Sequence, residues 1–207
     1  MPDLSPILAV IGALIPLECM QAGFMQRAML GLLLLAPMTA AMGVQVINLR
    51  MAFFSDAISH SAFAGIALGA LFSVHPHWSM PLLGVAVGIG IVAIGRHSML
   101  SSDTVIGVFF AAVTAGGIAL VSRDPSLARD TQMFLYGDIL TIADVDLLQL
   151  AGLLVLLSAF QVLAFNRILY ICINPDLAEV HRVRVWAYQY VFAGLLALVV
   201  IFSVWAM

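Results

Sequence analysis

Residues 28–65 read AMLGLLLLAPMTAAMGVQVINLRMAFFSDAISHSAFAG and contain the pattern that decides the fold. The run from Ala28 to Ile47 is almost entirely apolar, and its length is what an α-helix needs to cross about 30 Å of hydrocarbon. Asn48 and Arg50 end this run, and a second apolar run follows after a few residues. The stretch therefore predicts two successive membrane-spanning helices.

The composition of the whole chain also indicates a membrane protein. Hydrophobic residues make up 63% of its 207 residues and charged residues only 9%, whereas soluble domains contain roughly 45–50% and about 25%. The net charge of -3 is too small to indicate binding to nucleic acid. Cys19 and Cys172 lie far apart and outside any Cys-x-x-Cys pattern, so neither a disulfide nor a zinc cage is expected.

Apolar runs predict an all-α fold, a polytopic transmembrane bundle with six to seven membrane segments. Six runs are clear spans: Ala28–Ile47, Ala57–Val74, Met80–Ile94, Thr104–Val121, Leu147–Phe165 and Trp186–Met207. A shorter run, Ile7 to Ile15, either lies at the membrane interface or forms part of a seventh segment. We expect residues 1–207 to form one transmembrane domain, with 1–27 as an N-terminal apolar or interfacial segment and 28–207 as its core.

The arginines predict the orientation of these spans, because positively charged short loops tend to stay in the cytoplasm. All eight basic residues are arginine, and five of them fall at alternate span boundaries: Arg50, Arg96, Arg167, Arg182 and Arg184. Those boundaries are therefore expected on the cytoplasmic side. The connectors at 75–78 and 122–146 then face outward, together with Arg27.

Asp56 and His60 stand four residues apart, so on a helix they share one face. A carboxylate inside the hydrocarbon is costly and is kept there mainly for a partner or a transport path. Carboxylate plus imidazole is a common partial ligand set for zinc or manganese. Two structural interpretations compete: Ser55 or Asp56 caps the helix, and a neighbouring helix satisfies His60. One chain would supply two ligands, and a second copy would bring the number to four.

The remaining motifs are weaker indications of function than the pair Asp56 and His60. His75 and His77 could meet a metal in an outward loop, although solvated histidines are the simpler interpretation, and His97 and His181 read as interface residues. The chain has no phosphate-binding loop, no Ser-His-Asp set and no His-Glu-x-x-His pattern. We therefore expect no catalysis in this chain and no ATP hydrolysis by it. Glycines four apart, such as Gly65 with Gly69, indicate close helix packing within the bundle, with a dimer seam as the alternative.

Four blocks in order resemble the permease subunits of zinc/manganese-type ABC importers. They are RMAFFSDAISH at 50–60, LSSDTVIG at 100–107, LYGDIL at 135–140 and NPDLA at 174–178. The resemblance runs from about Phe24 to the end of the chain. It implies a subunit of the bacterial inner membrane that works as a homodimer or paired assembly with a cytoplasmic ATPase and an extracytoplasmic metal-binding protein. ATP would bind to the partner ATPase, and this chain would hold no cofactor of its own.

The resemblance also assigns residues. It implies that Asp56 and His60 are transient ligands of the transported metal. The chemistry of the ligands sets the order of zinc before manganese, since imidazole suits zinc and carboxylate suits manganese nearly as well. It implies that residues 174–183 form a cytoplasmic coupling helix that docks on the ATPase, with these residues in the docking segment: Asn174, Pro175, Asp176, Leu177, Ala178 and Glu179. Pro175 suits the first helical position, and Asp176 suits the positive end of the helix dipole.

The sequence departs from the family pattern in two places. Arg182 stands where the family commonly has glycine near the end of the coupling helix, which predicts a different helix end or a different ATPase partner. The chain also stops at Met207, inside an apolar run, so we expect it to lack the C-terminal helices of the family. Two alternatives therefore stay open: a permease for a metal chelate such as a siderophore or cobalamin, and a truncated subunit that binds the ATPase without transporting.

Overall fold

The computed structural model of this chain describes residues 22–123 and 142–206. These two stretches contain helices and no β-strand, so the predicted all-α class is confirmed for them. The helices are, in chain order, α2 (Gly23–Asn48), α3 (Phe54–Leu71), α4 (Pro76–His97), α5 (Ser102–Val121), α7 (Asp144–Ile173), α8 (Pro175–Val180) and α9 (Val185–Ala206). Most of the predicted segment 1–27 and of the connector 122–146 lies outside the described residues.

Five of the described helices are long and apolar enough to span a membrane: α2, α4, α5, α7 and α9. They correspond to five of the six predicted spans, although α7 contains 30 residues and extends beyond the predicted range Leu147–Phe165 at both ends. The remaining predicted span, Ala57–Val74, corresponds to α3, whose 18 residues are enough in length but too polar to place it among these five. Because α3 carries Asp56, His60 and several serines, it is the polar helix of an otherwise apolar bundle.

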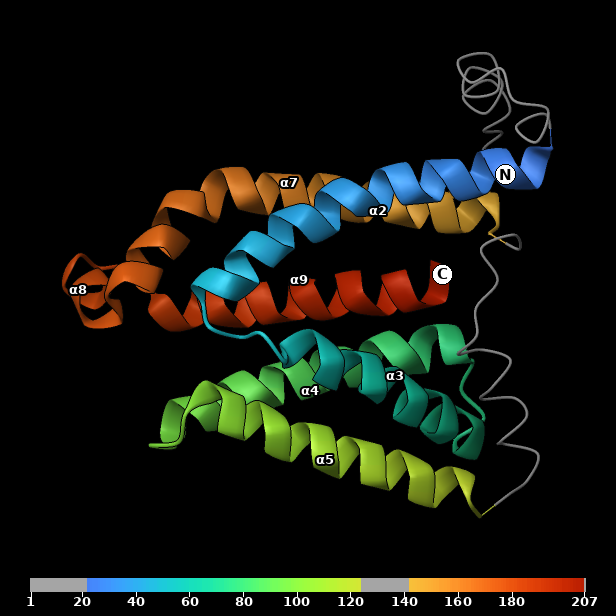
Figure 1. Ribbon diagram of the computed structural model, residues 1–207, viewed down its shortest axis with the longest axis horizontal. Helices are drawn as coiled ribbons and strands as arrows, with labels where there is room; N and C mark the ends of the chain where they lie inside the picture. The colour runs from blue at the N-terminus through green and yellow to red at the C-terminus, as the bar shows by residue number, and fades with distance from the viewer. Residues whose placement is uncertain (1–21, 124–141, 207) are drawn as a thin grey trace.

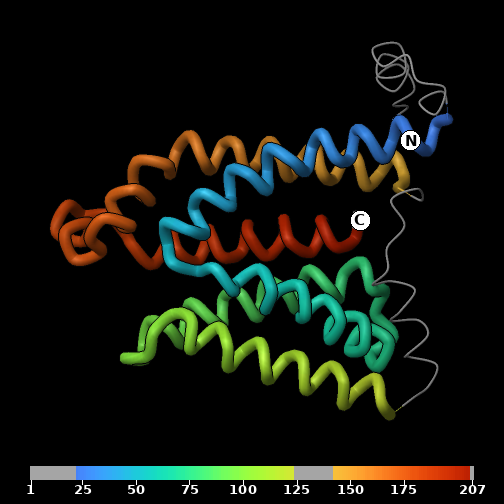
Figure 2. Tube along the Cα trace, viewed as in Figure 1, coloured from blue at the N-terminus to red at the C-terminus, as the bar shows by residue number. Residues whose placement is uncertain are grey.

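The helices lie roughly along one direction, with the connections at the two ends of the bundle (Figure 1). Helices α2 and α7 run together along one edge, α5 lies along the opposite edge, and α3, α4 and α9 lie between them. The tube in Figure 2 follows the same order and shows the start of α2 and the end of α9 at the same end of the bundle. Helix α3 packs most extensively against α4 and α5, which makes it a central element of the packed core.

The arginine-bearing boundaries share one end of the bundle, as the sequence predicts. The end of α2, the connection between α4 and α5, and α8 all lie at this end in Figure 1. Two arginines bind aromatic side chains in the first turn of α9 there: the guanidinium of Arg96 lies 4.4 Å from the ring centre of Trp186, and Arg167 Nη1 donates to Tyr188 Oη at 2.6 Å. These contacts connect α9 to α4 and α7.

Helix α3 begins well inside the length of the bundle. Figure 1 shows the connection after α2 running inward before α3 starts. The turn that ends α2 uses Arg50 in the left-handed backbone region, at φ 54°. Met51 N–H then donates to Val46 O at 3.0 Å, and Arg50 N–H donates to Ile47 O at 3.1 Å. This pattern closes the helix C-terminus in the manner usually supplied by glycine, and it directs the chain back into the bundle.

Glycines allow α3 to lie very close to its neighbours. A Cβ atom added at Gly65 would lie 2.9 Å from the Cα of Met80, so the backbones of α3 and α4 are nearly in contact there. A Cβ atom at Gly117 of α5 would lie 2.7 Å from the Phe63 ring of α3. These contacts are within one chain, as expected from the interpretation that the glycines serve packing inside the bundle.

Candidate functional site

Asp56 lies in the first turn of α3, and it does not cap the helix. The helix begins at Phe54, the cap position is Phe53, and no side chain makes a capping hydrogen bond. The interpretation that Ser55 or Asp56 is the N-cap is therefore wrong, because the aromatic pair before them already adopts the helical turn. The Asp56 side chain is exposed on the outer face of α3, close to the positive end of the helix dipole.

His60 lies one turn further along the same face, and its side chain is also exposed. Its ring meets the ring of Phe110 in α5 edge to face, with 4.8 Å between ring centres and an angle of 82°. Within the described residues His60 makes no hydrogen bond, so the interpretation of a histidine satisfied by a neighbouring helix is not supported. The imidazole nitrogens are available to a ligand.

The pair stands without further ligands from the rest of the described chain. Among residues 22–123 and 142–206, no group of three or more His, Cys, Asp or Glu side chains could hold a metal ion. Asp56 and His60 thus supply one carboxylate and one imidazole on a single helix face, which is fewer than the four ligands of a closed zinc site. This arrangement suits transient binding or a site completed by another chain.

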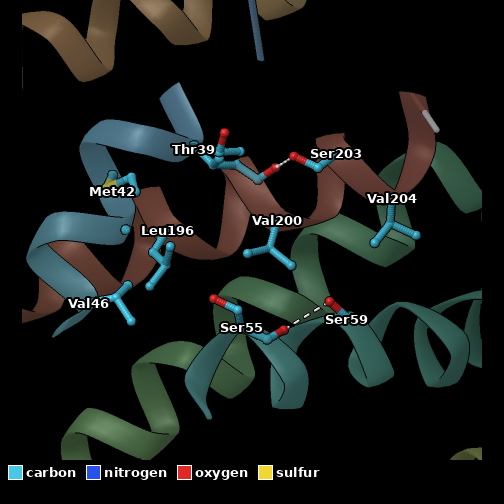
Figure 3. Close-up of a pocket in the computed structure, with 11 residues that line it drawn as sticks. Thr39, Met42, Val46, Ser55, Ser59, Leu196, Val200, Ser203 and Val204 are labelled. Atoms are coloured by element: carbon cyan, nitrogen blue, oxygen red, sulfur yellow. Dashed lines mark hydrogen bonds between the residues drawn. The ribbon is translucent and has the colours of Figure 1, made fainter. Parts of the chain in front are cut away.

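Two cavities flank the face of α3 that carries this pair. One, of about 450 Å³, is lined by residues of α3, α5 and α9 that include His60, Ser59 and Thr114. The other, of about 560 Å³, lies between α2, α3 and α9 (Figure 3). Ser59 and Val204 line both cavities, so the two spaces are adjacent.

Hydroxyl groups from three helices line the larger cavity among apolar side chains: Thr39, Ser55, Ser59 and Ser203 (Figure 3). Three of these hydroxyls donate to a carbonyl oxygen of their own helix, from Thr39 to Leu35, from Ser59 to Ser55 and from Ser203 to Val199. Their oxygens keep lone pairs that can accept hydrogen bonds. These lining residues could not be predicted from the sequence, because isolated hydroxyl residues in apolar runs form no pattern of their own.

The other histidines do not approach Asp56 and His60. His75 Nδ1 accepts from His77 N–H at 3.3 Å and so caps the start of α4. The ring of His77 lies edge to face against Trp205, and its Nε2 is 3.3 Å from Gln149 Nε2. His77 is therefore a packing residue that joins α4, α7 and α9 at the outward end predicted from the arginines. His97 bonds Ala93 O within its own helix.

The segment predicted as a coupling helix does form a short helix, α8. Its N-cap is Asn174, whose Oδ1 accepts from the N–H groups of Asp176 at 3.0 Å and Leu177 at 3.2 Å. Pro175 occupies the first turn, where its missing N–H costs nothing. The side chain of Ala178 is buried, whereas Leu177 and Val180 are 50% and 78% exposed. Helix α8 thus presents two apolar side chains outward from the end of the bundle.

The end of α8 has the geometry of a glycine cap even though arginine is present. Arg182 has φ 59°, and its N–H donates to Glu179 O at 2.9 Å. The next residue, Val183, donates from N–H to Ala178 O at 3.0 Å. These two bonds form a complete Schellman motif, so replacement of the family's glycine has not changed the helix end.

A small apolar cluster connects α8 to the turn that leads into α3. Its buried members are Ile171, Ala178 and Val185, and Leu49 packs against it from the end of α2. Leu49 also packs against the main core of the bundle. Leu49 therefore joins the cluster at α8 to the main core, which includes Phe54 and Ala57 of α3.

Nearly the whole chain matches one family. The ABC 3 transport family matches residues 21–207. The chain belongs to this family. Membership confirms the resemblance drawn from the four sequence blocks, of which the third, 135–140, lies outside the described residues. The family is one of transport proteins.

Relatives of this ABC 3 transport protein are named for zinc and for manganese. The high-affinity zinc uptake system membrane protein ZnuB of Haemophilus influenzae is 29% identical over 177 residues, which cover 85% of this chain and 67% of the relative. The manganese import system permease protein ScaB of Streptococcus parasanguinis is 31% identical over 179 residues, which cover 86% and 64%. The chain therefore spans about two thirds of the length of these relatives.

A solved structure has the same fold. PsaBC from Streptococcus pneumoniae in complex with Fab superimposes with a TM-score of 0.69 at 27% identity, over 87% of this chain and 65% of that chain. Together with the five apolar helices, these relatives make this ABC 3 transport protein an integral membrane protein of the bacterial inner membrane, as predicted.

Proposed function

We propose that this chain is the membrane-embedded permease subunit of an ATP-driven importer for a divalent transition metal, with zinc preferred and manganese next. One observation carries the proposal: Asp56 and His60 share the exposed face of α3, the helix that begins inside the bundle. An ionisable pair at this depth is costly unless it serves a partner or a path. The names of the zinc and manganese relatives support the class of substrate.

The remaining ligands would come from outside this chain. Two ligands bind a divalent metal weakly, and a second copy related by a two-fold axis would present the same two groups again. The homodimer explains why the exposed face of α3 carries both residues. An extracytoplasmic binding protein would deliver the metal to the opposite end of the bundle from α8.

The energy would come from a separate cytoplasmic ATPase, because this sequence contains no phosphate-binding loop. The segment from Asn174 to Glu179, which comprises the N-cap and most of α8, would dock on that ATPase, and the exposed side chains of Leu177 and Val180 would make the contact. Movement of α8 would reach α3 through the cluster that contains Leu49 and Ala178. Access to Asp56 and His60 would then change with each cycle of ATP hydrolysis.

The decisive experiment measures uptake of radioactive zinc and manganese by cells that express the assembled importer with Asp56→Ala or His60→Ala. We expect both variants to insert in the membrane and to assemble with the ATPase, but to lose uptake of both metals. His97→Ala is the matched control, because its ring bonds only within its own helix. Normal uptake by both site variants would refute the proposal.

The same experiment separates the two alternatives. A wild-type chain that co-purifies with the ATPase but restores no uptake in a deficient strain would be a non-transporting subunit. A permease for a metal chelate would not need the intramembrane ligand pair. It would also leave His60 equally open to chemical modification with and without added metal, whereas the proposed site should be protected by zinc or manganese.

A further inference from the structure

One residue that lines the cavity beside His60 carries a hydroxyl that no interaction within the described residues satisfies. Thr114 of α5 lines this cavity together with His60 and Ser59. Its Oγ1 is buried and has no hydrogen-bond partner within the part of the chain that the structure describes. A buried hydroxyl left unpaired costs about 1–3 kcal/mol, so its position calls for a reason.

Thr114 differs in this respect from other hydroxyl residues in the membrane helices. Thr39, Ser59 and Ser203 each donate to the carbonyl oxygen four residues earlier. Such bonds within a helix are the usual way to satisfy a hydroxyl in an apolar environment. Thr114 makes no such bond, and its hydroxyl remains free to serve another group.

The contacts on either side of Thr114 place it opposite the His60 turn of α3. Four residues before it, Phe110 meets the ring of His60 edge to face. Three residues after it, Gly117 packs against Phe63 of the same helix. Residues three and four apart lie on one helix face, so Thr114 sits on the face of α5 that α3 covers, between these two contacts.

A metal-binding histidine uses one ring nitrogen for the metal and almost always donates the N–H of the other to an oxygen acceptor, which fixes its tautomer and orientation. His60 has no such acceptor in the described structure, and Thr114, whose hydroxyl is buried and unpaired there, is a lining residue of the same cavity. We propose that Thr114 is a positioning residue for His60: its Oγ1 accepts the imidazole N–H when the other ring nitrogen binds the metal. The inference rests on the proposed role of His60 as a metal ligand.

Ser59 is the competing acceptor, since it lines the same cavity. However, as the neighbour of His60 on the same helix, Ser59 points about 100° away from it. Its bond to Ser55 O at 2.9 Å also holds the hydroxyl against its own backbone, although the oxygen can still accept. Thr114 approaches from the facing helix and has no other partner, which makes it the better acceptor. Ser59→Ala therefore serves as a second comparison in the test.

The test compares initial rates of zinc and manganese uptake by the assembled importer with Thr114→Val, Thr114→Ala and Thr114→Ser. Valine keeps the branched shape and removes the hydroxyl, alanine removes the hydroxyl with less bulk, and serine retains it. Loss of an outer-shell partner typically lowers metal affinity about 10–100-fold. We expect the KM for metal to rise by a factor in this range in the valine and alanine variants, while serine restores a nearly normal KM. Ser59→Ala should raise the KM less than Thr114→Val does, and Ser122→Ala, which removes a hydroxyl at the end of the same helix that bonds Ala119 O and lines neither cavity, should leave the KM unchanged.

An unchanged KM in both Thr114→Val and Thr114→Ala would overturn the inference. So would an equal rise in the valine and serine variants, because the effect would then come from packing and not from the hydroxyl. The outcome for His60→Ala separates this inference from the proposed function. Loss of uptake in His60→Ala with a normal KM in Thr114→Val would refute only the positioning role, whereas normal uptake in His60→Ala would refute both.

Discussion

Arg27 and Asp144 form an ion pair between the first turns of α2 and α7, with Arg27 Nε 2.8 Å from Asp144 Oδ1. The two residues are 117 positions apart in the sequence, and their helices pack along one edge of the bundle. The pair lies at the end opposite to α8, where an outward-facing arginine is otherwise unexpected. Its partner explains why Arg27 departs from the arginine pattern.

Reversing one charge of this pair should destabilise the protein, and reversing both should restore it. The side chains are 39% and 32% exposed, so solvent screens the attraction. We expect Arg27→Asp to lower the free energy of unfolding by up to about 1 kcal/mol, and Arg27→Asp with Asp144→Arg to recover most of the loss. The measurement is the midpoint of thermal unfolding in detergent at low and high salt. Equal effects in the single and double variants would mean that the pair contributes nothing.

Two glycines should respond to alanine with opposite signs. A Cβ atom at Gly65 would lie 2.9 Å from the Cα of Met80, so Gly65→Ala must push α3 and α4 apart, at a cost of about 1–3 kcal/mol. At Gly116 nothing lies within 4 Å of an added Cβ atom. Gly116→Ala should therefore stabilise α5 by about 0.5–1 kcal/mol, through its higher helix propensity. Thermal unfolding of both variants tests the packing, and a stable Gly65→Ala protein would contradict it.

The apolar runs were sufficient to predict most of the helices, because membrane length and hydropathy leave few alternatives. The apolar runs did not predict the residue at which each helix begins. Helix α7 begins at Asp144, within a stretch rich in aspartate that reads as a loop. There the Asp146 carboxylate accepts from the N–H of Ala143 at 3.0 Å, so these acidic residues belong to the helix start. Acidic residues that suggest a loop by composition can thus cap the start of a helix, as Asp146 does here.

The candidate site was predictable only in part, because some of its residues are brought together by contacts between helices that are distant in sequence. The spacing of Asp56 and His60 is visible in the sequence, since both residues are rare in apolar runs. Thr114 gives no such signal, because threonine is common in membrane helices and usually bonds its own backbone. Only the facing position of α5 makes Thr114 a lining residue of the cavity beside His60. Contacts between helices distant in sequence decide such positions, and no local pattern records them.

Leu49 should matter for transport more than for stability. It is half-buried and packs against both the main core and the small cluster around Ala178 of α8. If movement of α8 reaches α3 through this side chain, Leu49→Ala should reduce metal uptake several-fold while ATP hydrolysis by the assembled importer continues. The measurement is the amount of metal imported per ATP hydrolysed. Leu163→Ala is the control, because that side chain of α7 is 78% exposed. An unchanged ratio in Leu49→Ala would exclude this route.

Glycine at position 182 should stabilise the end of α8. Arg182 is held at φ 59°, a conformation that costs an L-residue about 1–2 kcal/mol and glycine much less. Arg182→Gly should therefore strengthen the two bonds that close the helix, from Arg182 N–H to Glu179 O and from Val183 N–H to Ala178 O. We expect amide hydrogen exchange at position 183 to slow by about fivefold, which corresponds to roughly 1 kcal/mol.

Arg184→Gly separates the backbone effect from the loss of positive charge. Among the described residues other than glycine, only Arg50, Ser73 and Arg182 have positive φ, so Arg184 carries no such strain. Its replacement removes the same charge without relieving the backbone, and exchange at position 183 should not slow. Arg182→Ala should likewise give no protection, because alanine meets the same steric penalty in the left-handed region. Equal protection in all three variants would show that charge, and not backbone conformation, limits the stability of this helix end.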